Sequence, residues 1–282
     1  SFKDETILLR PQFADVENLF SNETRIYQNK DLAWVSFAFS PSTIWPALEQ
    51  FIVKANIEIA KMYRSGTHWY IETEIINGLD SHSGSNIARH VDREFEAINL
   101  VFSLAPGLMS GKSELRVSSS LQELSSNSRK AILEEFYNFF EKSYADKKEF
   151  SQAVSAIDDI EHTRREVINN EDVLVISASA DRVFPVLVDI LSRSGSKIVG
   201  ADADGYIIQV AYINKEKRAR LSEKSAINKA LATALGSSFE AFEIELDIIG
   251  DELVVIFIKP ITNTNNDFAV KELQDLIFDN IF

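Results

Sequence analysis

Two stretches of the chain carry the same succession of hydrophobic patterns, an alternating run followed by a helical stripe. Residues 32–39 alternate in side-chain character from one position to the next, which predicts a strand. Apolar residues at offsets of one, four, seven and eight positions then predict a helix over residues 42–54. The stripe of the first half and its counterpart in the second half are Ile44, Trp45, Leu48, Phe51 and Ile52, and Val183, Phe184, Leu187, Ile190 and Leu191.

The elements around these stripes correspond as well. We expect Ser42 and Asp181 to be the N-caps of the two helices, and Pro46 and Pro185 to lie in their first turns. Each helix should be followed by two strands, which turn at Gly66 and Gly205, where glycine suits a positive φ. Two more strands are predicted in each half, at 95–104 and 112–119 and at 239–249 and 252–259, and each half ends in an apolar-striped helix.

This order of elements predicts an α+β protein made of two tandem helix-grip domains, each an antiparallel sheet with helices packed on one face. The expected organisation is an extended N-terminal arm remnant at 1–30, domain 1 at 31–148, a linker at 149–170 and domain 2 at 171–282. A length of 282 residues and an apolar share of 45% suit two ordinary globular domains.

Composition and charge exclude several kinds of chemistry. The formal net charge of −14 disfavours binding to nucleic acid or to anionic lipid surfaces. The absence of cysteine excludes disulfides, thiolate metal sites and cysteine nucleophiles within the sequence. No apolar run is long enough to be a transmembrane helix.

No catalytic or metal-binding motif stands out from the sequence. Gly111-Lys112-Ser113 resembles the end of a P-loop, but Pro106 occupies the position of its first glycine and a strand follows, so we interpret it as a turn. The histidines lack the spacing of zinc ligands, the acidic pairs are typical of exposed turns, and the basic run is typical of a solvated helix. These residues are His68, His82, His90 and His162, Asp158-Asp159 and Asp202/Asp204, and 215–224. We therefore expect no enzyme activity, no cofactor and no metal.

The order of these features resembles the BamC (NlpB) lipoprotein family of the outer-membrane β-barrel assembly machinery. The likeness rests on Ile44-Trp45-Pro46, the two helix-grip copies, the linker and the pattern of residues 242–282. Leu9-Arg10-Pro11-Gln12 is similar to the end of the family's long N-terminal arm. The likeness extends over nearly the whole chain, from about Ile7 to Phe282.

The resemblance implies a non-enzymatic accessory lipoprotein at the periplasmic face of the outer membrane of a Gram-negative bacterium. Its expected partners are BamD and other subunits of the machinery, and its only membrane contact is a lipid anchor, which we expect on a Cys upstream of Ser1. We predict partner contacts at Leu9, Arg10, Pro11 and Phe13, because an extended apolar segment with a proline can lie on another protein. The alternative is a periplasmic carrier that holds a small apolar ligand between sheet and helix.

Overall fold

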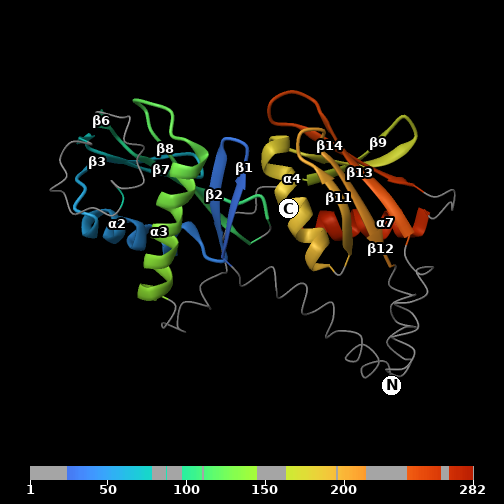
Figure 1. The fold of residues 1–282 in the computed structure, drawn as a ribbon, viewed down its shortest axis with the longest axis horizontal. Coiled ribbons are helices and arrows are strands. Elements are labelled where there is room, and N and C mark those ends of the chain that lie inside the picture. Colours follow the sequence, from blue (N-terminus) through green and yellow to red (C-terminus); the bar gives the residue numbers. More distant parts are fainter. Residues whose placement is uncertain are drawn as a thin grey trace, which may run out of the picture. The chain divides into compact units, whose positions relative to one another are not determined.

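The protein consists of two compact units, which separate between residues 160 and 161. Its computed structural model describes residues 24–77, 87, 97–109, 111–144, 163–194, 196–213, 240–261 and 267–281. Within these residues, each unit has a six-stranded antiparallel sheet and two helices (Figure 1).

The first unit begins with a hairpin, continues through a helix and a series of strands, and ends in a helix. Its strands and helices are β1 Arg25–Asn29, β2 Leu32–Phe37, α2 Pro41–Lys54, β3 Ile59–Ser65, β4 His68–Thr73, β5 Ile76–Asn77, β6 Ala97–Ile98, β7 Val101–Pro106, β8 Ser113–Ser118 and α3 Ser126–Tyr144. The large sheet has the order β1-β2-β8-β7-β4-β3, and β5 pairs with β6 separately.

The second unit repeats this plan. Its strands and helices are β9 Thr163–Ile168, β10 Glu171–Ile176, α4 Ala180–Arg193, β11 Lys197–Asp202, β12 Ile207–Tyr212, β13 Glu240–Ile248, β14 Val254–Pro260 and α7 Asp267–Asn280. The sheet order, β9-β10-β14-β13-β12-β11, matches that of the first unit strand for strand. In each unit the two helices contact one another and the same sheet. The predicted α+β class with two antiparallel-sheet domains is confirmed.

The first strand of each unit lies outside the predicted domain bounds. Strand β1 falls within the range predicted as an arm, and β9 falls within the range predicted as a linker. Both are edge strands that pair with the following strand through a two-residue turn, with Asn29 opposite Leu32 and Ile168 opposite Glu171. The sheets therefore include residues that the sequence interpretation had left outside them.

The helix starts also differ from the prediction. The N-caps of α2 and α4 are Ser40 and Ser179, two residues before the predicted Ser42 and Asp181. The backbone carbonyl of each serine accepts the first helical hydrogen bonds, for example from the N–H of Ile44 at 3.2 Å. Because the helices start earlier, Pro46 and Pro185 lie beyond the first turn, where a proline removes an intrahelical hydrogen bond.

The positive φ predicted for the turn glycines is observed at Gly66 in the first unit, but not at Gly205 in the second. Gly66 has a φ of +59° between β3 and β4, as expected. Gly205 has no positive φ, whereas the next residue, Tyr206, has a φ of +53°. The Asp202 carboxylate accepts hydrogen bonds from the N–H groups of Asp204 and Gly205, both at 3.1 Å. A Cβ at Gly205 would lie 2.6 Å from that carboxylate, so glycine is required for close approach.

The predicted strand at 95–104 is divided by a buried asparagine. Asn99 lies between β6 and β7 and is 5% exposed. Its amide nitrogen donates to Glu72 Oε1 at 3.0 Å and to Ser120 Oγ at 2.7 Å. Its amide oxygen accepts from Ser119 Oγ and from the N–H of Ser120, both at 3.1 Å. This network replaces the regular strand ladder at the point where the chain changes direction.

Replacing Asn99 with alanine is expected to lower the free energy of unfolding of the first unit by about 2–3 kcal/mol, because the hydrogen bonds of a buried amide are lost. Urea denaturation followed by tryptophan fluorescence measures the change. Asn127→Ala is the matched control, since Asn127 is exposed and accepts a single bond from Gln28. Equal stability of the two variants would contradict the role of the network.

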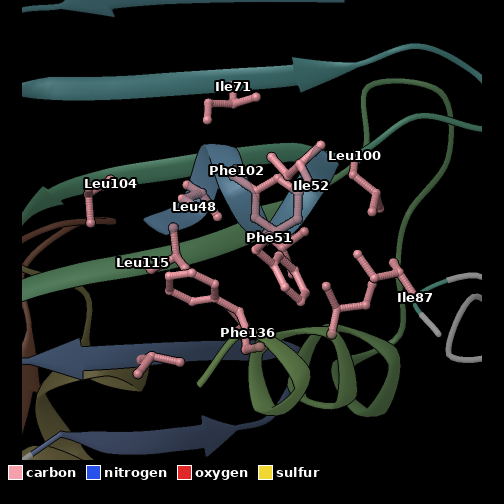
Figure 2. Close-up of a cluster of buried hydrophobic side chains, with 14 of the residues drawn as sticks. Leu48, Phe51, Ile52, Ile71, Ile87, Leu100, Phe102, Leu104, Leu115 and Phe136 are labelled. Atoms are coloured by element: carbon pink, nitrogen blue, oxygen red, sulfur yellow. The ribbon is translucent and has the colours of Figure 1, made fainter. Parts of the chain in front are cut away.

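The core of the first unit lies between the sheet and its two helices. Figure 2 shows Phe51 and Ile52 of α2, Phe102 of β7 and Phe136 of α3 gathered in one cluster. Ala33, Val35 and Phe37 belong to this cluster, on one face of the strand predicted at residues 32–39. Burial itself does not alternate, because Trp34 and Ser36 are buried as well. Nine of the ten predicted stripe residues are buried, and the exception is Trp45. Trp45 is half-buried and packs edge-on against Trp69, with ring centroids 5.3 Å apart.

Candidate functional site

The partner contacts predicted from the sequence are not placed by the structure. Leu9, Arg10, Pro11 and Phe13 lie outside the described residues. Other sequence candidates also lie outside the described residues, namely His82, His90, His162, Asp158, Asp159 and the basic run 215–224. Their roles remain predictions.

The sequence candidates that the structure does describe lie in turns and strands, where their contacts serve the fold. Gly111 has a φ of +67° in the turn between β7 and β8, and Ser113 begins a strand and donates to the backbone oxygen of Phe39 at 2.6 Å. This agrees with the interpretation of Gly111-Lys112-Ser113 as a turn. His68 is exposed on β4 and stacks on Tyr70 at 6.1 Å. Asp202 holds the β11–β12 turn through its carboxylate.

A buried carboxylate that the sequence did not indicate holds the turn before β8. Glu114 is 2% exposed and accepts a hydrogen bond from the N–H of Leu108 at 2.8 Å. Its other oxygen accepts from Arg116 at 3.1 Å. Because both oxygens have partners within the same segment, Glu114 serves to fix the 107–112 turn.

Within the described ranges, no group of three or more His, Asp or Glu side chains is arranged to hold a metal ion. None of the helices that the structure describes is long and apolar enough to cross a membrane.

The helix layer of the first unit contains an open pocket of about 240 Å³. It lies where the C-terminal end of α2 meets the second half of α3, with Ile87 as a further wall residue. The lining residues are Phe51, Lys54, Ala55, Ile87, Glu135, Asn138, Phe139 and Lys142. The pocket therefore combines aromatic and aliphatic surface with an equal number of polar and charged residues.

Burial divides the pocket into an apolar floor and a charged mouth. Phe51 and Ile87 are buried, and Figure 2 shows Phe51 in the middle of the core cluster and Ile87 at its edge, near α3. Lys54 and Lys142 are exposed, and the Lys54 ammonium lies 4.8 Å from the centre of the Phe139 ring. Such a cation–π contact holds the lysine across the aromatic surface. The pocket can accept an apolar group below a negative charge.

The sequence analysis missed this site because its residues are dispersed along the chain. Lys54 ends α2, Lys142 lies near the end of α3, and Ile87 comes from the segment between β5 and β6. One of the two lysines has a counterpart in the repeat, since Lys54 corresponds to Arg193 at the last position of α4.

The sheet–helix interface of the first unit, where the carrier hypothesis places a ligand, is occupied by aromatic side chains. Phe37 of β2 contacts Phe136 and Phe140 of α3 edge-on, with ring centroids 5.7 and 5.3 Å apart. Phe136 also meets Phe51 of α2 at 5.3 Å. These rings bridge the sheet and both helices, so the described core is packed with protein side chains.

No family model matches this chain, and no curated protein matches it.

Proposed function

We propose that this chain is a non-enzymatic accessory subunit that binds partner proteins in the assembly of outer-membrane β-barrel proteins, as in the BamC family. The observation that carries the proposal is the duplicated unit, in which both sheets have the same strand order. The same two-copy order of elements underlies the sequence resemblance. The Trp45-Pro46 pair of that resemblance lies on α2, and Pro185 occupies the same position on α4.

The packing of the first unit favours a binding module over a ligand carrier. A carrier of a small apolar molecule needs an enclosed cavity, typically about 300–1,000 Å³ in volume. The aromatic contacts among Phe37, Phe136 and Phe140 occupy the space between the sheet and α3. Surfaces and extended segments are then the parts of the molecule that remain for recognition.

The proposed partners are BamD and other subunits of the assembly machinery, and the proposed location is the periplasmic face of the outer membrane, through a lipid anchor. The arm residues Leu9, Arg10, Pro11 and Phe13 carry the proposed contact. An extended segment of this composition can dock along another protein more readily than it can build a core.

Alanine replacement of Leu9, Arg10, Pro11 and Phe13 together is expected to weaken binding to BamD of the same organism at least severalfold, because the apolar contacts of the arm are lost. Isothermal titration calorimetry measures the change.

A double alanine replacement of Glu5 and Thr6, which leaves the apolar residues intact, is the control for the arm experiment. Equal affinity of the quadruple variant and the unchanged chain would contradict the arm hypothesis. Capture of an apolar small molecule by the intact chain, without any affinity for BamD, would favour the carrier instead.

A further inference from the structure

We propose that the pocket between α2 and α3 is a docking site for an acidic segment of a partner protein, which packs one apolar side chain against Phe51 and Phe139 and places carboxylates beside Lys54 and Lys142. This inference rests on the proposed protein-binding function and names a site and a partner chemistry for it. Four features of the pocket support it: its size, its walls, its charge and its difference from the second copy.

The size of the pocket suits a single anchoring side chain. Its volume of about 240 Å³ lies below the roughly 300–1,000 Å³ typical of small-molecule sites. Protein interfaces commonly concentrate their binding energy in one apolar or aromatic residue that fills a pocket of this kind. An open pocket in a helix layer is also accessible to a polypeptide that continues on both sides of the anchor.

The walls of the pocket provide the apolar contact for that anchor. Phe51 belongs to the core and is held in place by Phe136 and Phe139, with ring centroids 5.3 and 5.6 Å away. Ile87 is 1% exposed and forms part of the same cluster. Because these floor residues are fixed by the core, the pocket is preformed and an incoming side chain does not have to order it.

The charge of the pocket mouth is opposite to that of the protein as a whole. The chain carries a formal net charge of −14, yet the pocket is lined by two lysines and a single carboxylate, Glu135. A local excess of positive charge on an acidic protein favours an acidic partner segment and disfavours basic ones. The same charges would orient the segment as its apolar residue enters.

In the second copy this position is neutralised by an ion pair within its own helix. Arg193, at the position of Lys54, forms an ion pair with Asp189 four residues earlier, at 3.0 Å, and both side chains are largely buried. The equivalent of Asp189 in the first copy is Gln50, which carries no charge. Lys142 likewise has an amide residue, Asn138, four positions earlier. Neither lysine therefore has a carboxylate four positions earlier on its own helix, the spacing at which helical ion pairs form.

The test uses the intact chain and an acidic pentapeptide with aspartate and glutamate on both sides of one central phenylalanine. Saturable binding is expected, with backbone NMR shifts at the lining residues. The double charge reversal Lys54→Glu and Lys142→Glu should weaken binding by on the order of tenfold or more. The double reversal Lys61→Glu and Lys197→Glu makes the same change in net charge at other exposed positions and should leave affinity unchanged.

Peptide controls separate the possible ligand chemistries. Replacing the central phenylalanine with serine should abolish binding, and equal binding of that peptide would overturn the proposal in favour of non-specific charge attraction. Binding of laurate at these lysines without any binding of the peptide would also overturn it, because the pocket would then serve a small apolar carboxylate.

The closing measurement distinguishes failure of this inference from failure of the proposed function. BamD binding is measured for the Lys54→Glu, Lys142→Glu chain and for the unchanged chain. Absence of peptide binding while BamD still binds through the arm would overturn the pocket site alone. Absence of both would overturn the pocket site together with the proposed function.

Discussion

Replacing Phe136 with alanine is expected to lower the free energy of unfolding of the first unit by about 3–5 kcal/mol, because a large ring leaves a cavity in a packed core. Phe136 has no solvent exposure and lies where the sheet and both helices meet. It makes edge-on contacts with Phe37 and Phe51, which add about 0.5–1.5 kcal/mol per pair beyond simple burial. Chemical denaturation followed by tryptophan fluorescence measures the loss.

The control for Phe136 is Leu121→Ala in the same unit. Leu121 is 52% exposed, so its truncation should change stability by no more than about 0.5 kcal/mol. A loss below about 1 kcal/mol for Phe136→Ala would mean that its ring is not part of the core, and would reopen the possibility of ligand space between the sheet and α3.

Much of the fold was predictable because the chain contains the same pattern twice. The apolar stripe of α2 predicted which face of the helix is buried, and the matching stripe of α4 indicated that the spacing was not accidental. The tight turn at Gly250 was also predictable, and its φ of +83° requires a conformation that glycine adopts easily. Periodicity and turn chemistry are local properties, so one sequence is sufficient to detect them.

Strands β1 and β9 escaped prediction because edge strands carry little hydrophobic pattern. Their sequences are polar at many positions, and only pairing with β2 and β10 defines them. One local indication was present, since Asn169 and Asn170 both have positive φ in the two-residue turn after β9. Consecutive asparagines between two strands are typical of such a turn. Because the two halves are equivalent, the same hairpin could then have been predicted for β1 and β2.

The pocket could not be predicted because it depends on distance in space. Lys54 and Lys142 are brought together only when α2 packs beside α3, and no local pattern specifies that pairing.

The prediction of the helix N-caps was wrong for a different reason. Ser40 and Ser42 are both good cap residues by type, and the choice of Ser40 is settled by where β2 ends.

Two leucines at equivalent positions of the repeat are each expected to stabilise only their own unit. Leu48 of α2 and Leu187 of α4 each have no solvent exposure. Truncation of either to alanine should lower the stability of its own unit by about 2–5 kcal/mol, because each removes buried contacts and leaves a cavity. Each unit has its own sheet and its own helix pair, so the loss should be confined to the unit that is changed.

The distribution of tryptophan makes this separation measurable in a single experiment. The three tryptophans are Trp34, Trp45 and Trp69, and all belong to the first unit. Tryptophan fluorescence therefore reports the unfolding of that unit alone, whereas far-ultraviolet circular dichroism reports both units. Leu48→Ala should lower the fluorescence midpoint, and Leu187→Ala should leave it unchanged while lowering the midpoint of a second transition in the circular dichroism signal.

A fluorescence midpoint that falls equally for both leucine variants would show that the two units unfold as one cooperative body, contrary to this expectation. Separate transitions would have a functional consequence as well. A partner that binds only the pocket between α2 and α3 stabilises the folded first unit by mass action, so a saturating acidic peptide should raise the fluorescence midpoint and leave the second transition where it is. The same pair of signals thus reports both the independence of the duplicated units and the unit on which a ligand acts.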